Sequence, residues 1–122
     1  MIVYFSLTGQ TRRFVNKLPD QAKLELTADG PIPELHEPYI LVVPTYVEEV
    51  TFPVNRFLDH GDNLSWCRGS FGGGNRNFAE LFCFTVEDLE EDYGIPVLHK
   101  FEFQGSDSDV ARLEEELAKI VS

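Results

Sequence analysis

Several stretches of this chain are almost entirely apolar, with no polar residue at alternate positions. Ile2–Phe5 and Tyr39–Thr45 have this character, and each is followed, after a short loop, by residues with helical spacing. A strand with one face in water alternates apolar and polar residues, whereas a strand buried on both faces does not. The sequence therefore predicts an α/β fold in which helices cover both faces of a parallel sheet.

The remaining pattern gives five strands in one domain, residues 1–122. Strands are expected at Ile2–Phe5, Ala22–Thr27, Tyr39–Thr45, Trp66–Gly72 and Val97–Phe103, and helices at Gln10–Leu18, Thr51–Gly61, Phe78–Tyr93 and Ser106–Val121. The segment Ala28–Pro38 holds one glycine and three prolines, which predicts a loop in place of the second helix. The common doubly wound order for five strands is 2-1-3-4-5, with ligand at the carboxyl ends of strands 1 and 3.

The segment Ser6–Thr11 joins the first strand to the first helix and is rich in hydroxyl groups. The first amides of a helix have no intrahelical partner and carry partial positive charge. Gly9 permits an unusual backbone conformation, and three hydroxyls can donate to oxygen atoms. This pattern predicts a phosphate site. The loop has no lysine, so it differs from the loop that binds nucleoside triphosphates with magnesium.

Two further loops are expected at the same edge of the sheet. Pro44–Val50 brings the aromatic Tyr46, and Gly72–Phe78 brings three glycines, two asparagines and the aromatic Phe78. Both rings can stack on a flat ligand, while amides bind its polar edge. Each ring can equally be an ordinary core or rim residue. A phosphate site facing a ring site suits flavin mononucleotide (FMN).

Four segments carry a resemblance to a known family. They are Thr11–Phe14, Glu37–Pro44, Gly74–Phe78 and Ile95–Ser106, and they occur in family order over nearly the whole chain. Together with Ser6-x-Thr8-Gly9-x-Thr11, which resembles the phosphate loop of flavodoxins, they look like NrdI, the short flavodoxin-like activator of class Ib ribonucleotide reductase.

The resemblance implies a flavodoxin-like fold, FMN as cofactor and an accessory role. Reduced flavin would react with dioxygen, and superoxide would serve the radical-generating subunit, with a flavodoxin-type protein as reductant. The implied cofactor-binding residues are Ser6, Leu7, Thr8, Gly9, Gln10 and Thr11 for the phosphate, and Thr45, Tyr46, Val47, Glu48, Gly73, Gly74, Asn75, Asn77 and Phe78 for the ring. The family usually has glycines after strand 3, whereas Val47–Thr51 has none, which opposes a peptide flip there.

Charge limits the partners. The formal net charge of −11 disfavours nucleic acid and anionic membranes and is compatible with a basic protein surface. The longest uncharged apolar run, Tyr39–Tyr46, is too short to span a bilayer. Met1 leads directly into a strand, which favours a cytoplasmic protein. Nothing in the sequence requires self-association, so a monomer is expected.

No catalytic residue and no metal site is assigned. Cys67 and Cys83 lack Cys-x-x-Cys spacing and are expected to be reduced and buried. The three histidines have no ligand-like spacing. His99 and Glu102 lie in the last predicted strand without a nucleophile or an acid/base partner in the pattern.

Several alternatives remain open. A general electron-transfer flavodoxin and a phosphate-binding module without flavin fit the same pattern, whereas a receiver domain does not, because Phe5-Ser6 stands where that fold needs acids. Arg12 and Arg13 either attract phosphate or balance an acidic surface. The acidic stretch 87–92 is either a solvated helix face or a docking patch. The partner's metal, dimanganese or none, is not predicted.

Overall fold

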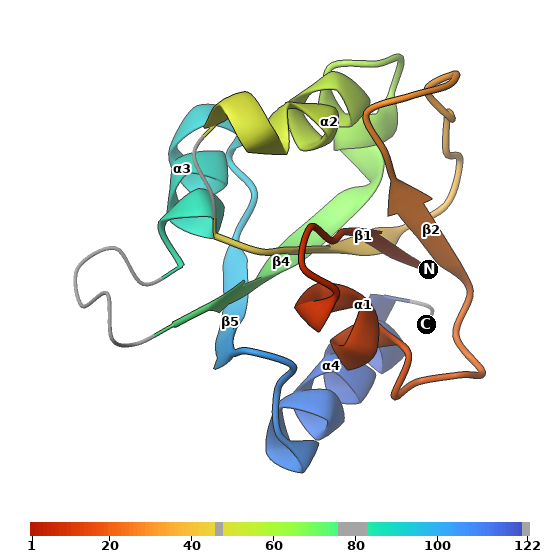
Figure 1. Cartoon of the computed structure of the whole chain (residues 1–122). Helices are drawn as coiled ribbons and strands as arrows, with labels where there is room; N and C mark the ends of the chain where they lie inside the picture. The colour runs from red at the N-terminus through yellow and green to blue at the C-terminus, as the bar shows by residue number, and fades with distance from the viewer. Residues whose placement is uncertain (46–47, 76–82, 121–122) are drawn as a thin grey trace.

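The strands form one parallel sheet in the order β2-β1-β3-β4-β5, as the sequence predicts. The computed structural model describes residues 1–45, 48–75 and 83–120 (Figure 1). Its strands are β1 (Ile2–Phe5), β2 (Lys23–Leu26), β3 (Tyr39–Val43), β4 (Cys67–Gly74) and β5 (Val97–Glu102). Every residue of β1 and β3 is buried, which explains why neither strand alternates polar and apolar residues.

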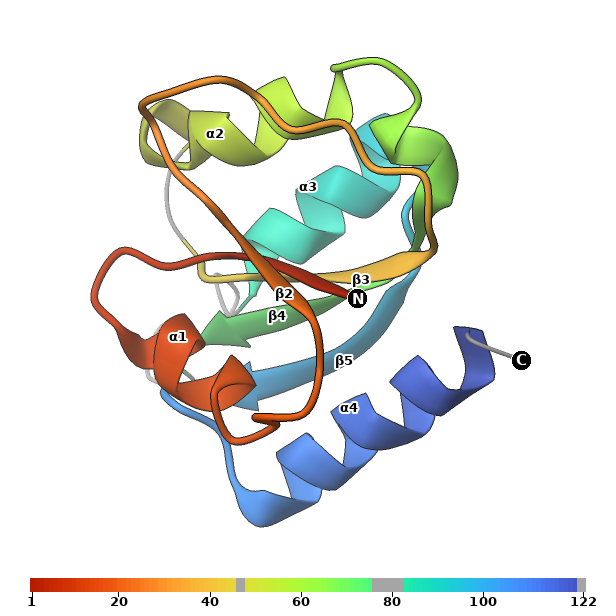
Figure 2. The same cartoon turned by 90° about the vertical axis from the view of Figure 1, so that its right-hand side faces the viewer.

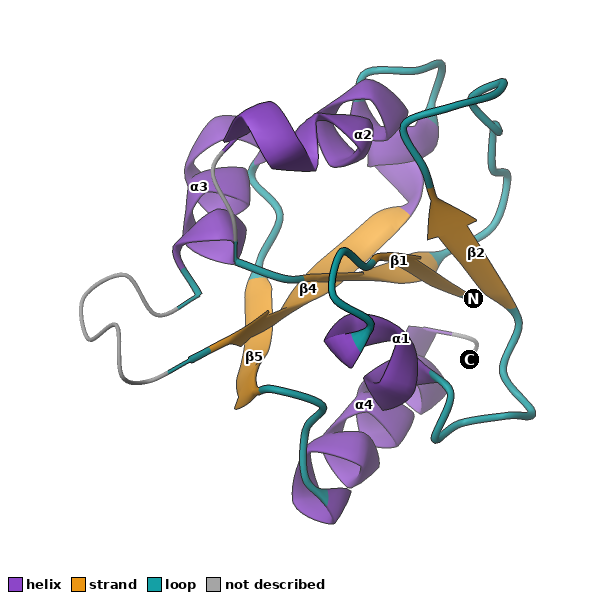
Figure 3. Ribbon diagram, viewed as in Figure 1, coloured by secondary structure: helices purple, strands orange, loops and turns teal. Residues whose placement is uncertain are grey.

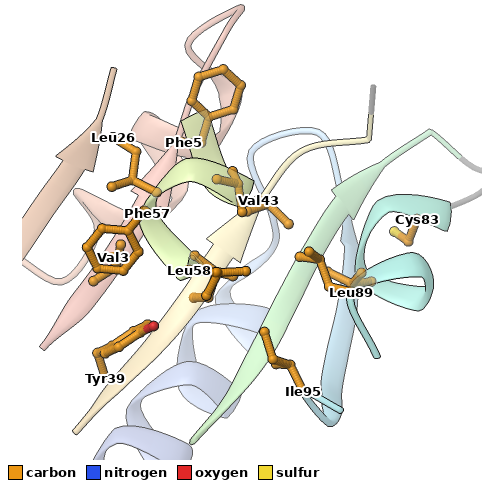
Figure 4. Close-up of a cluster of buried hydrophobic side chains, with 13 residues drawn as sticks. Val3, Phe5, Leu26, Tyr39, Val43, Phe57, Leu58, Cys83, Leu89 and Ile95 are labelled. Carbon is orange, nitrogen blue, oxygen red and sulfur yellow. The ribbon is translucent and has the colours of Figure 1, made fainter. Parts of the chain in front are cut away.

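Helices cover both faces of this sheet, so the predicted doubly wound α/β architecture is confirmed. They are α1 (Gln10–Val15), α2 (Glu48–Leu58), α3 (Phe84–Tyr93) and α4 (Asp107–Ile120), with a 3₁₀ turn, η1 (Asn63–Trp66). α1 and α4 lie on one face, and α2 and α3 on the other (Figure 2). Each face of the sheet has its own hydrophobic core. In the core under α1 and α4, the ring centroids of Phe14 and Phe101 lie 4.0 Å apart. Val43 and Phe57 belong to the core under α2 and α3 (Figure 4). None of the helices in the described part of the chain is long and apolar enough to cross a bilayer.

A loop replaces the second helix, as predicted, over residues 27–38 (Figure 3). Asn63, which is wholly buried, holds this loop against the end of α2. Its amide nitrogen donates to the carbonyl oxygens of Pro33 and Phe57, both at 2.9 Å, and its amide oxygen accepts from the backbone N–H of Leu35 at 2.7 Å. The loop is therefore anchored by a side chain rather than by regular secondary structure.

The start of α2 differs from the prediction. The sequence places the first turn at Thr51 because Pro53 fits a first turn, whereas α2 begins at Glu48 and contains Pro53. A proline inside a helix gives up one backbone hydrogen bond. The buried side chains of Val54 and Phe57 offset this loss, since most helix stability in proteins comes from packing. Glu48 thus belongs to a helix and not to the loop after β3.

Strand β4 also runs further than predicted, to Gly74 instead of Gly72, because Gly73 and Gly74 continue the strand instead of opening a loop. A Cβ atom on Gly72 would lie 2.6 Å from a methyl group of Val86, and one on Gly73 would lie 2.9 Å from the ring of Phe101. These glycines allow close packing of a helix and a neighbouring strand on β4. The flexibility that a glycine run indicates in a sequence is not their role here.

Two helix ends differ as well. α1 ends at Val15 rather than Leu18, and residues 16–18 continue as a tighter turn. Cys83 directly precedes α3 with φ 58°, a left-handed conformation that an α-helix does not contain. The predicted helix from Phe78 is therefore not continuous through Cys83, and its residues 78–82 lie outside the described part.

Candidate functional site

The carboxyl ends of β1, β3 and β4 meet at one edge of the sheet (Figures 1 and 3). The chain leaves β1 toward β2 on one side and β3 toward β4 on the other, so this edge is a switch point, where doubly wound folds bind ligands. Residues 6–11, 44–45 and 75 follow these strand ends, as predicted. The other predicted residues here, Tyr46, Val47, Asn77 and Phe78, lie outside the described residues.

The first loop has the backbone of an anion site. Gly9 caps α1 with φ 92°, and a Cβ atom there would meet nothing within 4 Å, so glycine is required for its conformation rather than for space. Ser6 Oγ accepts from the N–H of Arg12 at 3.3 Å. The amides of Gln10 and Thr11 have no hydrogen-bond partner within the described chain.

The side chains of this loop divide into two groups. Thr8 and Leu7 are exposed, Leu7 at 46%, whereas Thr11 is only 2% exposed and packs beneath the loop. Ser6 is partly exposed. The hydroxyls of Ser6 and Thr8 are thus accessible to a ligand, in contrast to the side chain of Thr11.

Arg12 pairs with an acidic side chain, as its role in balancing an acidic surface requires. Its guanidinium donates to both carboxylate oxygens of Glu25, at 3.2 and 2.5 Å, and Tyr4 donates its hydroxyl to the same carboxylate at 2.9 Å. The hydrogen bond from Arg12 lowers the pKa of Glu25, despite partial burial. Arg12 therefore ties α1 to β2.

The second loop is tied to the end of β4. Thr45 Oγ1 donates to the carbonyl oxygen of Gly73 at 2.7 Å. The loop is also shorter than predicted, because α2 begins at Glu48. The segment after β3 and the end of β4 are thus joined by a hydrogen bond.

Sequence reasoning missed Cys83 as a residue of this edge. Its thiol is wholly buried and donates to the carbonyl oxygen of Gly72 at 3.3 Å. A Cβ atom on Gly74 would lie 3.1 Å from Thr45 Oγ1 and 3.2 Å from Cys83 Sγ, so Gly74 leaves room for both side chains. Burial raises the pKa of the Cys83 thiol to about 11. A lone cysteine has no sequence pattern that predicts such a position.

Phe103 is a second residue that the sequence pattern did not single out. Its N–H donates to the carbonyl oxygen of Gly74 at 3.1 Å, its φ is 52°, and it is 51% exposed. A left-handed conformation is uncommon for an aromatic residue. An exposed aromatic ring therefore lies beside the end of β4.

His99 and Asp109 have a structural role. His99 Nε2 lies 2.6 Å from Asp109 Oδ1, while Asp109 Oδ2 accepts from the N–H of Ser106 at 2.8 Å. The N–H of Asp109 in turn donates to Ser106 Oγ at 3.3 Å, so Ser106 and Asp109 form a capping box at the start of α4. Burial alone would raise the pKa of Asp109, but the hydrogen bonds from His99 and Ser106 lower it overall.

Metal-binding side chains do not gather in the described ranges 1–45, 48–75 and 83–120, where no group of three or more His, Cys, Asp or Glu residues could hold an ion. What the switch-point edge offers is a loop with unpaired amides on one side and close-packed glycines on the other. Such an edge can bind an anion and a flat group together.

Comparisons with known proteins agree with this geometry. A family model described as NrdI flavodoxin-like matches residues 2–115. Protein NrdI of Ruegeria sp. (strain TM1040) is 36% identical over 98% of this chain and 88% of its own. The structure of a short-chain flavodoxin associated with a non-canonical PDU bacterial microcompartment covers 98% of this chain and 94% of its own, with a TM-score of 0.70 and 19% identity, which shows a shared fold. The flavodoxin-like fold is therefore confirmed, and the chain belongs to the NrdI flavodoxin-like family.

Proposed function

We propose that this chain binds FMN and acts as the accessory flavoprotein of a class Ib-like ribonucleotide reductase. Family membership supports the accessory role. When bound and reduced, FMN would supply the electron that converts dioxygen to superoxide for the radical-generating subunit. The protein itself contributes binding, orientation and electrostatics.

The loop after β1 is the observation that carries the cofactor assignment. The amides of Gln10 and Thr11, at the start of α1, have no partner among the described residues, and Ser6 and Thr8 in the same loop are at least partly exposed. Four donors at a positively polarised helix start suit a phosphate group. Gly9 supplies the left-handed turn that directs the chain from β1 into α1.

The ring is proposed to lie between the loops that follow β3 and β4. Thr45 joins the two segments through its hydrogen bond to Gly73, and Gly74 leaves room for the side chains of Thr45 and Cys83. Tyr46, Val47, Asn77 and Phe78 remain proposed ring-lining residues. Glu48, the first residue of α2, also remains a proposed cofactor-binding residue.

The partner is proposed to be the radical-generating subunit, with a flavodoxin-type protein as reductant. The net charge of −11 favours a basic docking surface on either protein. We further propose a cytoplasmic monomer.

Flavin binding can be measured directly. Purified protein should bind FMN with a flavin absorption band, and Ser6→Ala and Thr8→Ala should each weaken binding about tenfold, because each removes one charge-assisted hydrogen bond. Ser108→Ala, an exposed hydroxyl on α4, is the matched control and should leave the affinity unchanged. A protein that stays colourless in excess FMN would refute the cofactor assignment.

The accessory role needs a second assay. Photoreduced protein is mixed with dioxygen, with and without the radical-generating subunit, and the protein radical is measured by electron paramagnetic resonance. Radical formation that requires both proteins supports the proposal. Equal electron delivery to unrelated acceptors, with no radical in the partner, would instead identify a general electron-transfer flavodoxin.

A further inference from the structure

A pocket of about 310 Å³ lies between strand β2, the loop that follows it and helix α2. Figure 2 shows this loop running past α2. None of the pocket's residues belongs to the proposed flavin site. They are Leu24, Glu25, Leu26, Thr27, Gly30, Pro31, Ile32, Pro33, Pro53, Arg56 and Phe57. The volume falls at the lower end of the range of about 300–1,000 Å³ found for small-molecule sites.

The walls of the pocket are held in place without a ligand. The buried amide of Asn63 donates to the carbonyl oxygens of Pro33 and Phe57, which lie on opposite walls. Arg56 Nη1 donates to the carbonyl oxygen of Ala28 at 3.0 Å and so ties α2 to the loop a second time. A preformed pocket binds ligands at a lower entropic cost than one that must be ordered first.

The charges around the pocket favour one kind of ligand. Arg56 has no carboxylate partner among the described residues, although the chain carries an excess of acids. Glu25, the acidic residue of the lining, already accepts hydrogen bonds from Arg12 and Tyr4. The guanidinium thus retains donors for an incoming anion, while the nearby carboxylate is already paired.

We propose that this pocket binds a small carboxylic acid with an apolar body, whose carboxylate pairs with Arg56. Leucine, isoleucine, proline and phenylalanine side chains make up most of the lining, which suits an aliphatic or aromatic body. Arg56 is the one cationic residue of the described lining, which matches a singly charged carboxylate better than a phosphate dianion. This site is independent of the proposed flavin function.

The probes are benzoate and octanoate, titrated into the full-length, FMN-saturated protein while amide chemical shifts are followed by NMR. We expect saturable shifts confined to residues 24–33 and 53–57, with a dissociation constant of about 1 mM or tighter. Arg56→Gln should weaken binding at least tenfold. Benzyl alcohol, which has the same ring without the charge, should bind at least tenfold more weakly than benzoate.

Arg68→Gln is the matched control, because Arg68 makes the same two kinds of contact. Its guanidinium donates to a backbone carbonyl oxygen at 2.8 Å and lies 5.9 Å from the Trp66 ring, as Arg56 lies 6.0 Å from that of Phe52. Arg68→Gln should leave benzoate binding unchanged. Absence of saturable shifts up to about 20 mM, shifts that map elsewhere, or equal binding of benzyl alcohol would overturn the proposal.

Discussion

Replacing Asn63 with alanine is expected to destabilise the protein strongly, although Asn63 lies in none of the strands, helices or site loops predicted from the sequence. The side chain makes three hydrogen bonds to the backbone, at Pro33, Phe57 and Leu35. The net value of a protein hydrogen bond is about 0.5–1.5 kcal/mol, and a buried group left unpaired costs about 1–3 kcal/mol. The carbonyl oxygen of Phe57 keeps a hydrogen bond from the N–H of His60 at 3.2 Å, and Pro33 is exposed, so the main cost is the loss of three hydrogen bonds at about 1 kcal/mol each. The sum is a loss of about 3 kcal/mol.

The assay is equilibrium unfolding in urea, followed by circular dichroism. For a domain of this size, about 3 kcal/mol corresponds to a melting temperature roughly 10 °C lower. Asn16→Ala is the control, because Asn16 is exposed at the end of α1, and it should stay within about 0.5 kcal/mol of the native chain. A loss below about 1 kcal/mol for Asn63→Ala would refute the assigned role.

Asn63→Asp tests the direction of the hydrogen bonds. The amide faces two carbonyl oxygens and one N–H group, so its nitrogen must point at Pro33 and Phe57. Aspartate keeps the acceptor for Leu35 but places a negative charge against two carbonyl oxygens. It should therefore be at least as destabilising as alanine, and a stable Asn63→Asp variant would show that the amide does not join the loop to α2.

Three further perturbations follow from other contacts. Gly105→Ala should cost about 3 kcal/mol in urea unfolding, because Gly105 has φ 76° and an added Cβ would lie 2.5 Å from the buried ring of Phe14; a neutral result would contradict this packing. Asp109 has a lowered pKa, so on acidification the unfolded chain takes up its proton first, and native stability should fall relative to Asp109→Ala as the pH drops below the ordinary value of 3.8; parallel pH profiles would exclude this linkage. Cys83 is wholly buried with a pKa of about 11, so iodoacetamide at pH 8 should label it only after unfolding, as read by mass spectrometry, and rapid labelling of the native protein would contradict its burial.

The sheet order and its two covered faces were predictable because burial leaves a direct mark on composition. Ile2–Phe5 and Tyr39–Val43 have no polar face since helices pack on both sides of β1 and β3. The loop in place of the second helix was equally visible, because the three prolines of Ala28–Pro38 exclude a helix. These are local constraints that hold whatever the rest of the chain does.

The start of α2 was not predictable in the same way. Pro53 is common in the first turn of a helix, so the local rule favours a start near Thr51. The observed start at Glu48 depends on Val54 and Phe57 packing on the sheet, which is a tertiary effect. As a result, the sequence assigned Glu48 to a loop of the candidate site although it belongs to a helix.

Asn63 and Cys83 are two further residues whose roles could not be predicted from the sequence. Each acts through groups distant in sequence, Asn63 through Pro33 and Cys83 through Gly72, and neither belongs to a spacing pattern. Only the folded chain shows that the buried side-chain amide of Asn63 anchors the loop that stands in place of the second helix. Sequence spacing predicts which elements form, whereas the anchors of irregular segments depend on contacts that spacing does not encode.

The three consecutive glycines of β4 show how one short motif serves both the core and the site. Gly72 and Gly73 make room for Val86 and Phe101, which belong to opposite cores, and Gly74 makes room for Thr45 and Cys83 at the edge. A methyl group at Gly72 or Gly73 would therefore disturb the packing of the sheet, whereas one at Gly74 would press directly on the hydroxyl that holds the loop after β3. The end of β4 beside the proposed ring site is thus shaped by the same close packing that builds the fold.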